Sequence, residues 1–441
     1  MAFSVGVISL GCNKNRVDTE TALGFLQEDG FVFTPRPEEA DVLMVNTCGF
    51  IDSAKEESIN TILEMAQYKE CGRCRLLVVT GCLAQRYEKD LLKEMPEIDL
   101  LLGVNQYASL PAMIRRALEG KEEARRSACG DDYGYCEHRR VLTTPSYSAY
   151  VRIGEGCSNR CTFCAIPLIR GPYRSRGEDA ILREIRELAE QGVREHILVA
   201  QDTTRYGTDD HEHTTLPDLM RKAAAIDGVD WLRVLYCYPD ETNDELLDVL
   251  ADLPNVCPYL DIPIQHVNAE LLRRMHRQGT REDILRCVRG ARSRGLTLRT
   301  SIIVGFPGET EDQFKELLDF VGETEFDRLG AFTYSPEEGT PAAKLPDQLP
   351  EEVKQERYAR LMELQRSVSR RRNEVRVGDT EQVLVTAAGD DGFCLGRSSR
   401  EAPETDGEIL VRCGEPAPEP GLFIPVRITE AGDYDLKGEM L

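Results

Sequence analysis

The 441-residue chain has no long apolar run and none of the features of a secretory leader. No apolar stretch approaches the roughly 18 residues that a membrane-spanning helix needs, so we expect no membrane partner. The opening residues, MAFSVGVISLGC, lack both the basic flank and the small-residue cleavage site of a signal peptide. We therefore expect a cytoplasmic protein.

Basic residues are scarce relative to acidic ones. The chain has 54 Lys and Arg against 77 Asp and Glu, and its formal net charge is -23. Nucleic-acid phosphates select basic surfaces, so this charge argues against broad attraction to RNA, although a local basic patch is compatible with it. A basic protein is the partner that the charge favours.

The chain also lacks the small size of a disulfide scaffold, although it contains 15 cysteines. Disulfide-rich frameworks are short secreted chains, whereas clustered cysteines in a long cytoplasmic chain more often bind metal or perform thiol chemistry. A chain of this length is expected to form two or three domains, each with its own core.

Three units of strand, turn and helix come first. Apolar strands are predicted over residues 5 to 10, 41 to 45 and 76 to 79, each followed by a helix, and the first helix is expected to start near Asp18. This alternation predicts an open parallel α/β domain, to which we assign residues 1–125.

A cysteine lies just past the carboxyl end of each of these strands. Cys12, Cys48 and Cys82 each stand beside a glycine, at the edge where open α/β sheets bind ligands, so we expect them to converge on one site. The alternative is that they pack as small apolar residues. Their shared position argues against that alternative.

Residues 143–374 continue the alternation with six apolar strands, separated by helices. Six such units predict a partial (β/α)6 barrel of the TIM type. The last helix, over residues 351 to 374, is highly charged and contains Arg370, Arg371 and Arg372, which we interpret as either a basic patch or a solvated helix face. Residues 376–441 form short alternating segments with turns, which predict a small antiparallel β-barrel.

The most specific motif is Cys157, Cys161 and Cys164 in a C-x3-C-x2-C run directly after the first barrel strand. Three thiolates leave one iron of a 4Fe-4S cube without a protein ligand, and an open iron can bind a small molecule. A zinc site normally needs a fourth Cys or His nearby, and none follows as far as Arg176.

With Phe163 before the last cysteine, this run resembles the signature of the radical S-adenosylmethionine (AdoMet) superfamily. The resemblance implies that AdoMet binds the open iron and is cleaved to a 5'-deoxyadenosyl radical, with the three cysteines as catalytic ligands. Polar groups at later strand ends are candidates to bind the cofactor. These candidates, together with Phe163, are Gln201, Asp202, Gln265 and Gly305.

Three arginines, Arg170, Arg174 and Arg176, follow the motif closely. Guanidinium groups at this point are suited to offset the charge of a cluster or to hold a carboxylate. The alternative interpretation is a set of surface arginines at the start of a helix.

The whole chain resembles the methylthiotransferase family, which combines three scattered amino-terminal cysteines, a radical AdoMet barrel and a small carboxyl-terminal TRAM barrel. The resemblance implies two 4Fe-4S clusters, the second on Cys12, Cys48 and Cys82, and a low-potential electron donor. It also implies that CH3-S is joined to an unactivated carbon. The source of the sulfur, the cluster or added sulfide, stays open.

Three motifs resemble the branch of this family that modifies a ribosomal protein: SLGCNKNRVDTE, IPIQH before LLRRMHR, and GRSSREAPETDG. The implied substrate is the β-carbon of an aspartate in small-subunit ribosomal protein 12, free or in the ribosomal subunit. Residues 376 to 441 hold six Lys and Arg against 14 Asp and Glu, so tRNA is disfavoured. The alternatives are a tRNA methylthiotransferase and a two-cluster electron carrier.

Overall fold

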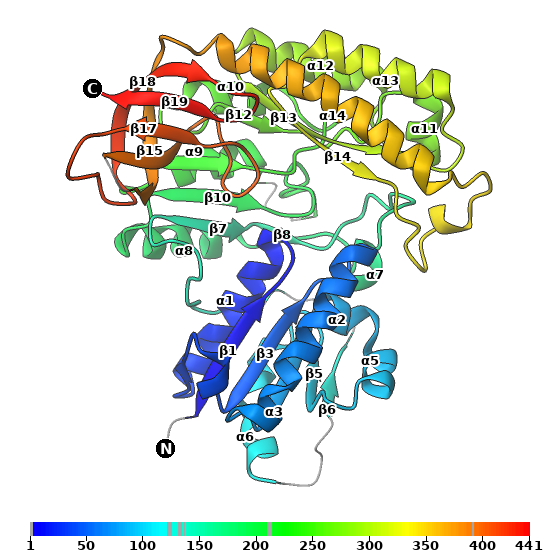
Figure 1. The fold of residues 1–441 in the computed structure, drawn as a ribbon, viewed down its shortest axis with the longest axis vertical. Helices are drawn as coiled ribbons and strands as arrows, with labels where there is room; N and C mark the ends of the chain where they lie inside the picture. The colour runs from blue at the N-terminus through cyan, green and yellow to red at the C-terminus, as the bar shows by residue number, and fades with distance from the viewer. Residues whose placement is uncertain (1–2, 121–125, 131–134, 136, 210–213, 390–391) are drawn as a thin grey trace.

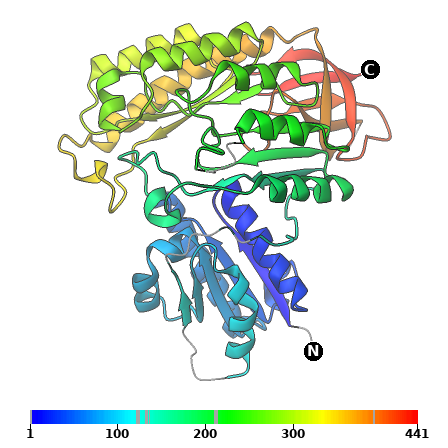
Figure 2. The ribbon, with the colours of Figure 1, turned by 180° about the vertical axis from the view of Figure 1, so that it is seen from behind.

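The computed structural model describes residues 3–120, 126–130, 135, 137–209, 214–389 and 392–441. An amino-terminal α/β domain lies below a larger unit, in which the central barrel and the carboxyl-terminal barrel pack side by side (Figure 1); Figure 2 shows the same arrangement from behind. Among these residues, no helix is both long and apolar enough to span a bilayer.

The amino-terminal domain is built on a six-stranded, all-parallel sheet of order β2-β1-β3-β4-β5-β6. Its strands are β1 (Ser4–Ser9), β2 (Val32–Phe33), β3 (Val42–Thr47), β4 (Leu76–Gly81), β5 (Leu100–Leu102) and β6 (Arg126–Ala128). Its helices are α1 (Asn13–Glu28), α2 (Asp52–Ala66), α3 (Tyr68–Cys71), α4 (Cys82–Arg86), α5 (Glu88–Glu94) and α6 (Leu110–Leu118). The predicted open parallel sheet is confirmed.

Two details of this domain differ from the expectation or extend it. Helix α1 starts at Asn13, not near Asp18, because the Asn15 amide donates to the carbonyls of Leu10 (2.6 Å) and Thr47 (3.2 Å) and so fixes the turn. The predicted boundary at residue 125 lies outside the described residues, and β6 follows it.

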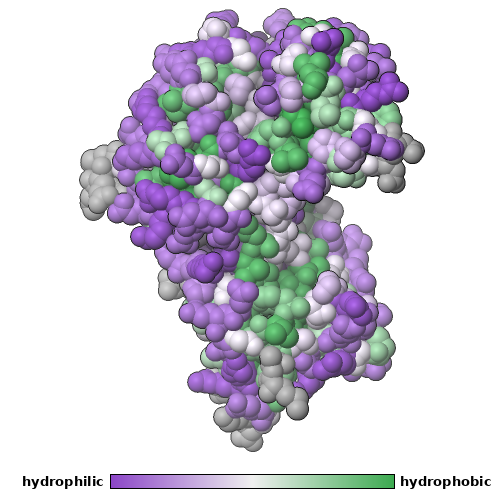
Figure 3. Space-filling model, turned by 90° about the vertical axis from the view of Figure 1, so that its left-hand side faces the viewer, coloured by the Kyte–Doolittle hydropathy of each residue, from purple (hydrophilic) through white to green (hydrophobic). Residues whose placement is uncertain are grey.

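On the face shown in Figure 3, a band of apolar side chains crosses this domain.

The central unit has the six predicted strands, in two parallel sheets of order β7-β10-β11 and β12-β13-β14. A parallel bridge from Leu232 to Val256 joins the two sheets. The barrel is open because the outer strands β7 and β14 are not neighbours in either sheet. The strands are β7 (Ser148–Arg152), β10 (Glu195–Val199), β11 (Trp231–Val234), β12 (Tyr259–Asp261), β13 (Thr297–Val304) and β14 (Arg328–Thr333). A short antiparallel ribbon, β8 (Gly154–Glu155) and β9 (Arg174–Ser175), follows β7.

Helices cover the outside of this barrel. They are α8 (Glu178–Glu190), α9 (Leu216–Ala224), α10 (Asp244–Asp252), α11 (Ala269–Arg274), α12 (Arg281–Ser293), α13 (Glu311–Thr324) and α14 (Glu351–Glu374). The short helix α7 (Ile166–Arg170) lies instead at the interface with the amino-terminal domain, against α4. Capping boxes at Thr215, Thr280 and Thr310 start α9, α12 and α13, because each hydroxyl satisfies a free N–H of the first turn.

The carboxyl-terminal residues form a closed five-stranded barrel of order β15-β16-β17-β19-β18. Its strands are β15 (Thr380–Ala388), β16 (Phe393–Ser398), β17 (Ile409–Arg412), β18 (Phe423–Ala431) and β19 (Leu436–Met440). The predicted small barrel is confirmed, with one addition: β17 and β19 pair in parallel, whereas the other pairs are antiparallel.

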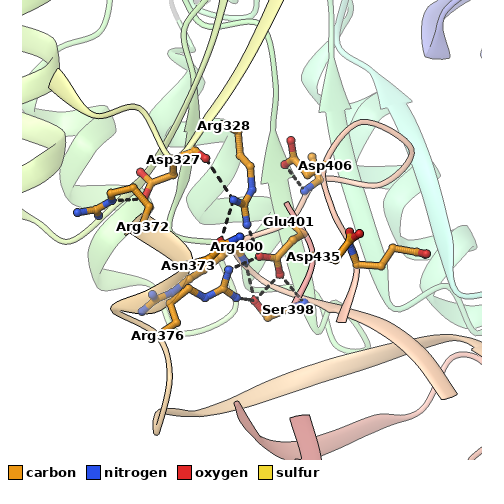
Figure 4. A network of polar contacts seen from close by, with 12 residues as sticks. Asp327, Arg328, Arg372, Asn373, Arg376, Ser398, Arg400, Glu401, Asp406 and Asp435 are labelled. Atoms are coloured by element: carbon orange, nitrogen blue, oxygen red, sulfur yellow. Dashed lines mark hydrogen bonds and ion pairs between the residues drawn. The ribbon is translucent and has the colours of Figure 1, made fainter. Parts of the chain in front are cut away.

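The loop between β16 and β17 fastens this small barrel to the central one. Glu401 is buried and accepts hydrogen bonds from Arg328 (2.9 Å) and Ser398 (2.8 Å) while it pairs with Arg376, as Figure 4 shows. Farther along the loop, Asp406 accepts from the Tyr259 hydroxyl at 2.6 Å. The GRSSREAPETDG motif therefore joins the two barrels.

A second fastening point is Glu195, which is fully buried at the start of β10. It accepts hydrogen bonds from Arg233 (3.1 Å), Arg397 (2.9 Å) and Ser148 (3.0 Å), so strands of both barrels meet at one carboxylate. Burial raises its pKa, but Arg397 and Arg233 lower it more, to about 2. The carboxylate is therefore ionised at neutral pH.

We expect Glu195→Gln to destabilise this junction by about 3–5 kcal/mol, because two buried guanidinium groups lose their counter-charge. The unfolded pKa of a glutamate is about 4.3, so this stabilisation is complete above that pH and declines as the pH falls toward 2. The chain's sole tryptophan, Trp231, packs on Phe423 across the junction and reports urea unfolding by fluorescence.

The matched control is Glu430→Gln, which removes an exposed ion pair with Lys437 in the same small barrel. Exposed pairs contribute about 0–1 kcal/mol, so this variant should unfold almost as the wild type does. The deficit of Glu195→Gln should shrink between pH 5 and about pH 3. Equal urea midpoints for the two variants at pH 7 would contradict the assignment.

Candidate active site between the amino-terminal domain and the barrel

The three amino-terminal cysteines meet at the carboxyl ends of β1, β3 and β4. Gly11 has a φ of +86° and packs directly against Cys48. A Cβ atom added at Gly11 would lie 2.8 Å from the Cβ of Cys48. Cys82 begins α4, and burial, with further contributions from Cys12 and Cys48, raises its pKa to about 12. The predicted convergence of these three strand ends is therefore what the structure shows.

The C-x3-C-x2-C run forms a loop between β8 and α7, at the mouth of the barrel. Cys157 and Cys161 are buried, and Cys164 is half-buried. The Arg277 guanidinium lies 3.9 Å from the sulfur of Cys161, and the Thr162 N–H donates to the carbonyl of Met275 at 3.0 Å. Burial, with the charges of Asp202 and Cys161, raises the pKa of Cys157 to about 11.

Each cysteine set offers three thiols, the ligand type that holds iron–sulfur cubes. Among the described residues, no group of three His, Cys, Asp or Glu side chains is placed to hold one ion. In a cube, each thiolate binds a different iron, so the sulfurs stand apart around the cluster. Burial raises the pKa of Cys48, Cys82, Cys157 and Cys164, so metal binding must displace protons from these four thiols.

Gln201 and Asp202, which we predicted to bind the cofactor, lie beside the cluster loop. Asp202 is fully buried and accepts from Asn159 (2.6 Å), Thr204 (2.5 Å) and Arg205 (3.2 Å). Because Asn159 belongs to the cysteine loop, Asp202 fixes that loop. The Gln201 amide donates to Glu155 at 3.3 Å, and its buried oxygen has no partner within the described part of the chain.

Of the other cofactor candidates, Phe163 belongs to the cysteine loop itself, whereas Gln265 and Gly305 follow β12 and β13. The Phe163 ring packs against a group of apolar side chains around Leu271. Gln265 has a φ of +66° and forms a parallel β-bridge with Ile302. The N–H of Gly305 donates to Glu309, and a Cβ there would lie 2.5 Å from Lys354 of α14. Gly305 is therefore required for the approach of α14, and its role toward a cofactor stays a prediction.

Arg170, at the end of α7, connects the two cysteine sets. Its side chain is 1 % exposed and donates to Asp18 (2.7 Å), to Glu155 (3.0 Å) and to the sulfur of Cys82 (3.3 Å). Arg152 adds an ion pair to Asp18 at 2.7 Å. Of the alternatives for the three arginines, the charge-offsetting one therefore fits Arg170, which is not on the surface.

The charges in this network stay ionised. Burial alone would raise the pKa of Glu155, but Arg170 and Arg152 hold it below its usual value. The same two guanidinium groups face Asp18, so two carboxylates and two guanidinium groups balance inside the domain interface. A sulfur ligand at Cys82 therefore lies beside a permanent positive charge.

On the other side of the interface, Glu337 of the barrel reaches the amino-terminal domain. Its carboxylate, which is 2 % exposed, accepts from Lys55 of α2 (2.9 Å) and from Arg86 of α4 (3.0 Å). Arg86 also donates to the carbonyl of Gly49, next to Cys48. The site is thus bounded by polar contacts on two sides.

Sequence reasoning did not find Asp18, Glu155 or Glu337 as parts of the site. For Asp18 the sequence did carry a signal, because the first turns of α1 are polar on nearly every face. In the structure, Lys14, Asn15 and Asp18 of this polar segment are buried. A polar helix face that is buried must meet polar partners from another element. For Glu155 and Glu337, the chain around them gave no such pattern.

Three family models match successive parts of the chain. The Radical SAM superfamily matches residues 151–321, the uncharacterized protein family UPF0004 matches residues 4–103, and the TRAM domain matches residues 377–441. These matches coincide with the central barrel, the amino-terminal sheet and the small barrel.

Curated relatives match nearly the full length. A ribosomal protein uS12 methylthiotransferase RimO of Desulforamulus reducens is 50% identical, over 99% of each chain. The protein of the same name in Caldicellulosiruptor saccharolyticus is 47% identical, again over 99% of each chain. Such identity over the full length shows a common family as well as a common fold.

Solved structures share the fold at low identity. A radical S-adenosylmethionine methyltransferase, TsrM, from Kitasatospora setae, matches with a TM-score of 0.57 and 15% identity, over 78% of this chain and 74% of that one. The cobalamin-dependent radical enzyme OxsB matches with a TM-score of 0.52 and 13% identity, over 83% and 56% of the two chains. These likenesses support the arrangement of the domains.

We expect Arg170→Met to destabilise the interface by about 3–5 kcal/mol, because Asp18 and Glu155 would stay buried with one cation fewer. Hydrogen exchange of the metal-free protein should show faster exchange in α1 and β7. The matched control is Arg186→Met, since Arg186 is exposed on α8. Unchanged exchange in both variants would contradict the role of Arg170.

Proposed function

The chain belongs to the RimO family of ribosomal protein uS12 methylthiotransferases, and we propose that it joins CH3-S to the β-carbon of an aspartate in uS12. The observation that carries this proposal is the full-length match, at 50% identity, to a curated member, together with two sets of three cysteines that face one interface. It is a radical AdoMet enzyme that transfers sulfur.

We assign the two cysteine sets to two 4Fe-4S clusters. Cys157, Cys161 and Cys164 would hold the catalytic cluster, and Cys12, Cys48 and Cys82 the auxiliary one. When bound, these clusters supply the electron that cleaves AdoMet and an open iron for sulfur. In this proposal the auxiliary cluster belongs to the domain of residues 1–125 and the catalytic cluster to the barrel of residues 143–374. Residues 376–441 form the small TRAM barrel.

The chain's own residues hold the two cysteine sets in position. Asp202 and Asn159 fix the cysteine loop, and Arg170 ties that loop to Cys82 through Glu155. The buried oxygen of Gln201, which has no partner among the described residues, is available to a donor group of the cofactor. Phe163, Gln265 and Gly305 surround the mouth and stay candidates for the same role.

A basic protein substrate fits the surface better than tRNA does. A cavity of about 470 Å³ between the two barrels is lined mainly by neutral residues, and its charged groups are the carboxylates of Glu404, Asp406, Glu408 and Asp435 against the one guanidinium of Arg397. The basic run at the end of α14 is neutralised: Arg370 pairs with Glu374 and Asp433, and its two neighbours pair with Glu325 and Asp327. A tRNA backbone therefore gains no basic track on α14.

Two further points of the proposal follow from the substrate. Because uS12 is a ribosomal protein, we place the enzyme in the cytoplasm, with free uS12 or the small subunit as its partner. Reduction of the catalytic cluster needs a low-potential electron donor, which the assay replaces with dithionite.

The proposal is tested with anaerobically reconstituted full-length enzyme, AdoMet, dithionite and sulfide. We offer a peptide of the uS12 loop and a tRNA anticodon stem-loop, and read both by mass spectrometry. A gain of about 46 Da on the peptide, from replacement of H by CH3-S, is the expected result. The same gain on the RNA alone would identify the tRNA branch. No gain on either substrate would overturn the proposed substrate.

The cysteine variants test whether the clusters divide the work. Each of Cys157→Ala and Cys48→Ala should lower bound iron from about eight to about four atoms per chain. Cys157→Ala should abolish formation of 5'-deoxyadenosine, whereas Cys48→Ala should retain it and lose sulfur insertion. The matched control is Cys287→Ala, which removes a buried thiol on α12. Equal loss of both activities in the first two variants would contradict the division.

A further inference from the structure

Lys14 is a buried cation at the second position of α1, two residues after Cys12. Its side chain is 8 % exposed, and its ammonium lies 3.4 Å from the centre of the Tyr236 ring. Within the described part of the chain, that ring is its sole recorded partner, and it forms no ion pair. Asp18, a buried charged residue of the same helix, differs from Lys14 because it forms ion pairs with two arginines.

The stem of Lys14 is largely buried, and no carboxylate of the described residues pairs with its ammonium, which is uncommon for a lysine in such a position. A cation over an aromatic face recovers about 2 kcal/mol when both groups are desolvated. The ammonium has three donors, and a ring face cannot satisfy all of them. The position is therefore prepared for an anion that the chain itself does not supply.

The start of α1 strengthens this conclusion. Cys12 is the N-cap residue, no side chain caps the helix, and its first turn holds no acidic residue. The free N–H groups and the dipole at such a helix end favour an anion. Asn13 donates to the Tyr236 hydroxyl at 3.2 Å, which holds the ring in place beneath the ammonium.

The ammonium also lies between the two cysteine sets. Tyr236 follows β11 at the barrel mouth, and its carbonyl accepts from the N–H of Thr203, next to Asp202. Tyr238, two residues farther on, is close enough to Cys157 and Cys161 for their charges to affect it. Lys14 is thus a second cation, besides Arg170, between Cys12 and the loop that holds Cys157 and Cys161.

We propose that Lys14 binds the side-chain carboxylate of the target aspartate, while Tyr236 holds the ammonium in position. This assignment rests on the proposed function, because an aspartate is the anion that the reaction brings to this point. A carboxylate fixed at Lys14 presents the adjacent β-carbon to the space between the cysteine sets. Lys14 is therefore a specificity-determining residue that distinguishes aspartate from asparagine.

The test uses the reconstituted full-length enzyme with two uS12-loop peptides, one with the target aspartate and one with asparagine in its place. Lys14→Met keeps the length and apolar stem of the side chain and removes the charge. A charge-assisted hydrogen bond contributes about 1.5–3 kcal/mol, so kcat/KM for the aspartate peptide should fall about 10- to 100-fold. The preference for aspartate over asparagine should fall by a similar factor.

Two further variants separate binding from packing. Lys14→Arg keeps the charge and should retain most of the preference for aspartate, whereas a packing role would make the bulkier arginine worse than methionine. Lys222→Met, which removes an exposed lysine on α9, is the matched control and should behave as the wild type does. Iron and sulfide contents, measured for every variant, show whether both clusters are loaded.

The outcomes separate the two levels of the proposal. A wild-type enzyme that leaves the aspartate peptide unmodified would overturn the proposed function, and the role of Lys14 with it. If the wild type is active and Lys14→Met has the same KM and the same preference for aspartate, the assignment of Lys14 alone is overturned. A loss of kcat/KM with an unchanged preference would also overturn it, because it would indicate a merely structural role.

Discussion

The ion pairs of Arg170 and Arg152 with Asp18 and Glu155 are the interaction on which the rest of the site depends. Asp18 belongs to the amino-terminal domain, and the other three belong to the barrel, so the network lies across the domain interface. Breaking one member leaves an unpaired buried charge, which costs several kcal/mol. These ion pairs therefore act together with apolar contacts across the interface, where Val17 packs with Tyr150, and Cys82 packs with Ile169.

This constraint explains how the polar interface supports chemistry. Arg170 donates to carboxylates on two sides and to the Cys82 sulfur, so the contact that joins the domains also sets the charge beside a thiol ligand. Hydrogen bonds to ligand sulfurs and nearby charge tune iron–sulfur clusters. On the other side of the interface, Glu337 accepts hydrogen bonds from Lys55 and Arg86. The two domains are therefore held together at both ends of the site.

The sequence predicted what depends on local pattern. Strand and helix alternation predicted the first two folding units, and short strands separated by turns predicted the third. The placement of Cys12, Cys48 and Cys82 at strand ends predicted their convergence, because parallel strands end at one edge. It could not predict which charge meets which across the interface, since Asp18 and Arg170 are 152 residues apart. The start of α1 was also misplaced, because the side-chain bonds of Asn15 are not visible in a periodicity.

Directional contacts are the reason that this interface is charged. An apolar interface of equal area would hold the domains together, but apolar packing has no preferred angle. A planar guanidinium whose donors meet acceptors from different elements fixes direction as well as distance. Arg170 satisfies Asp18 and Glu155 together in one orientation of the two domains. In the reaction that we propose, the two cysteine sets act on a common carbon, so that reaction requires this directional restraint.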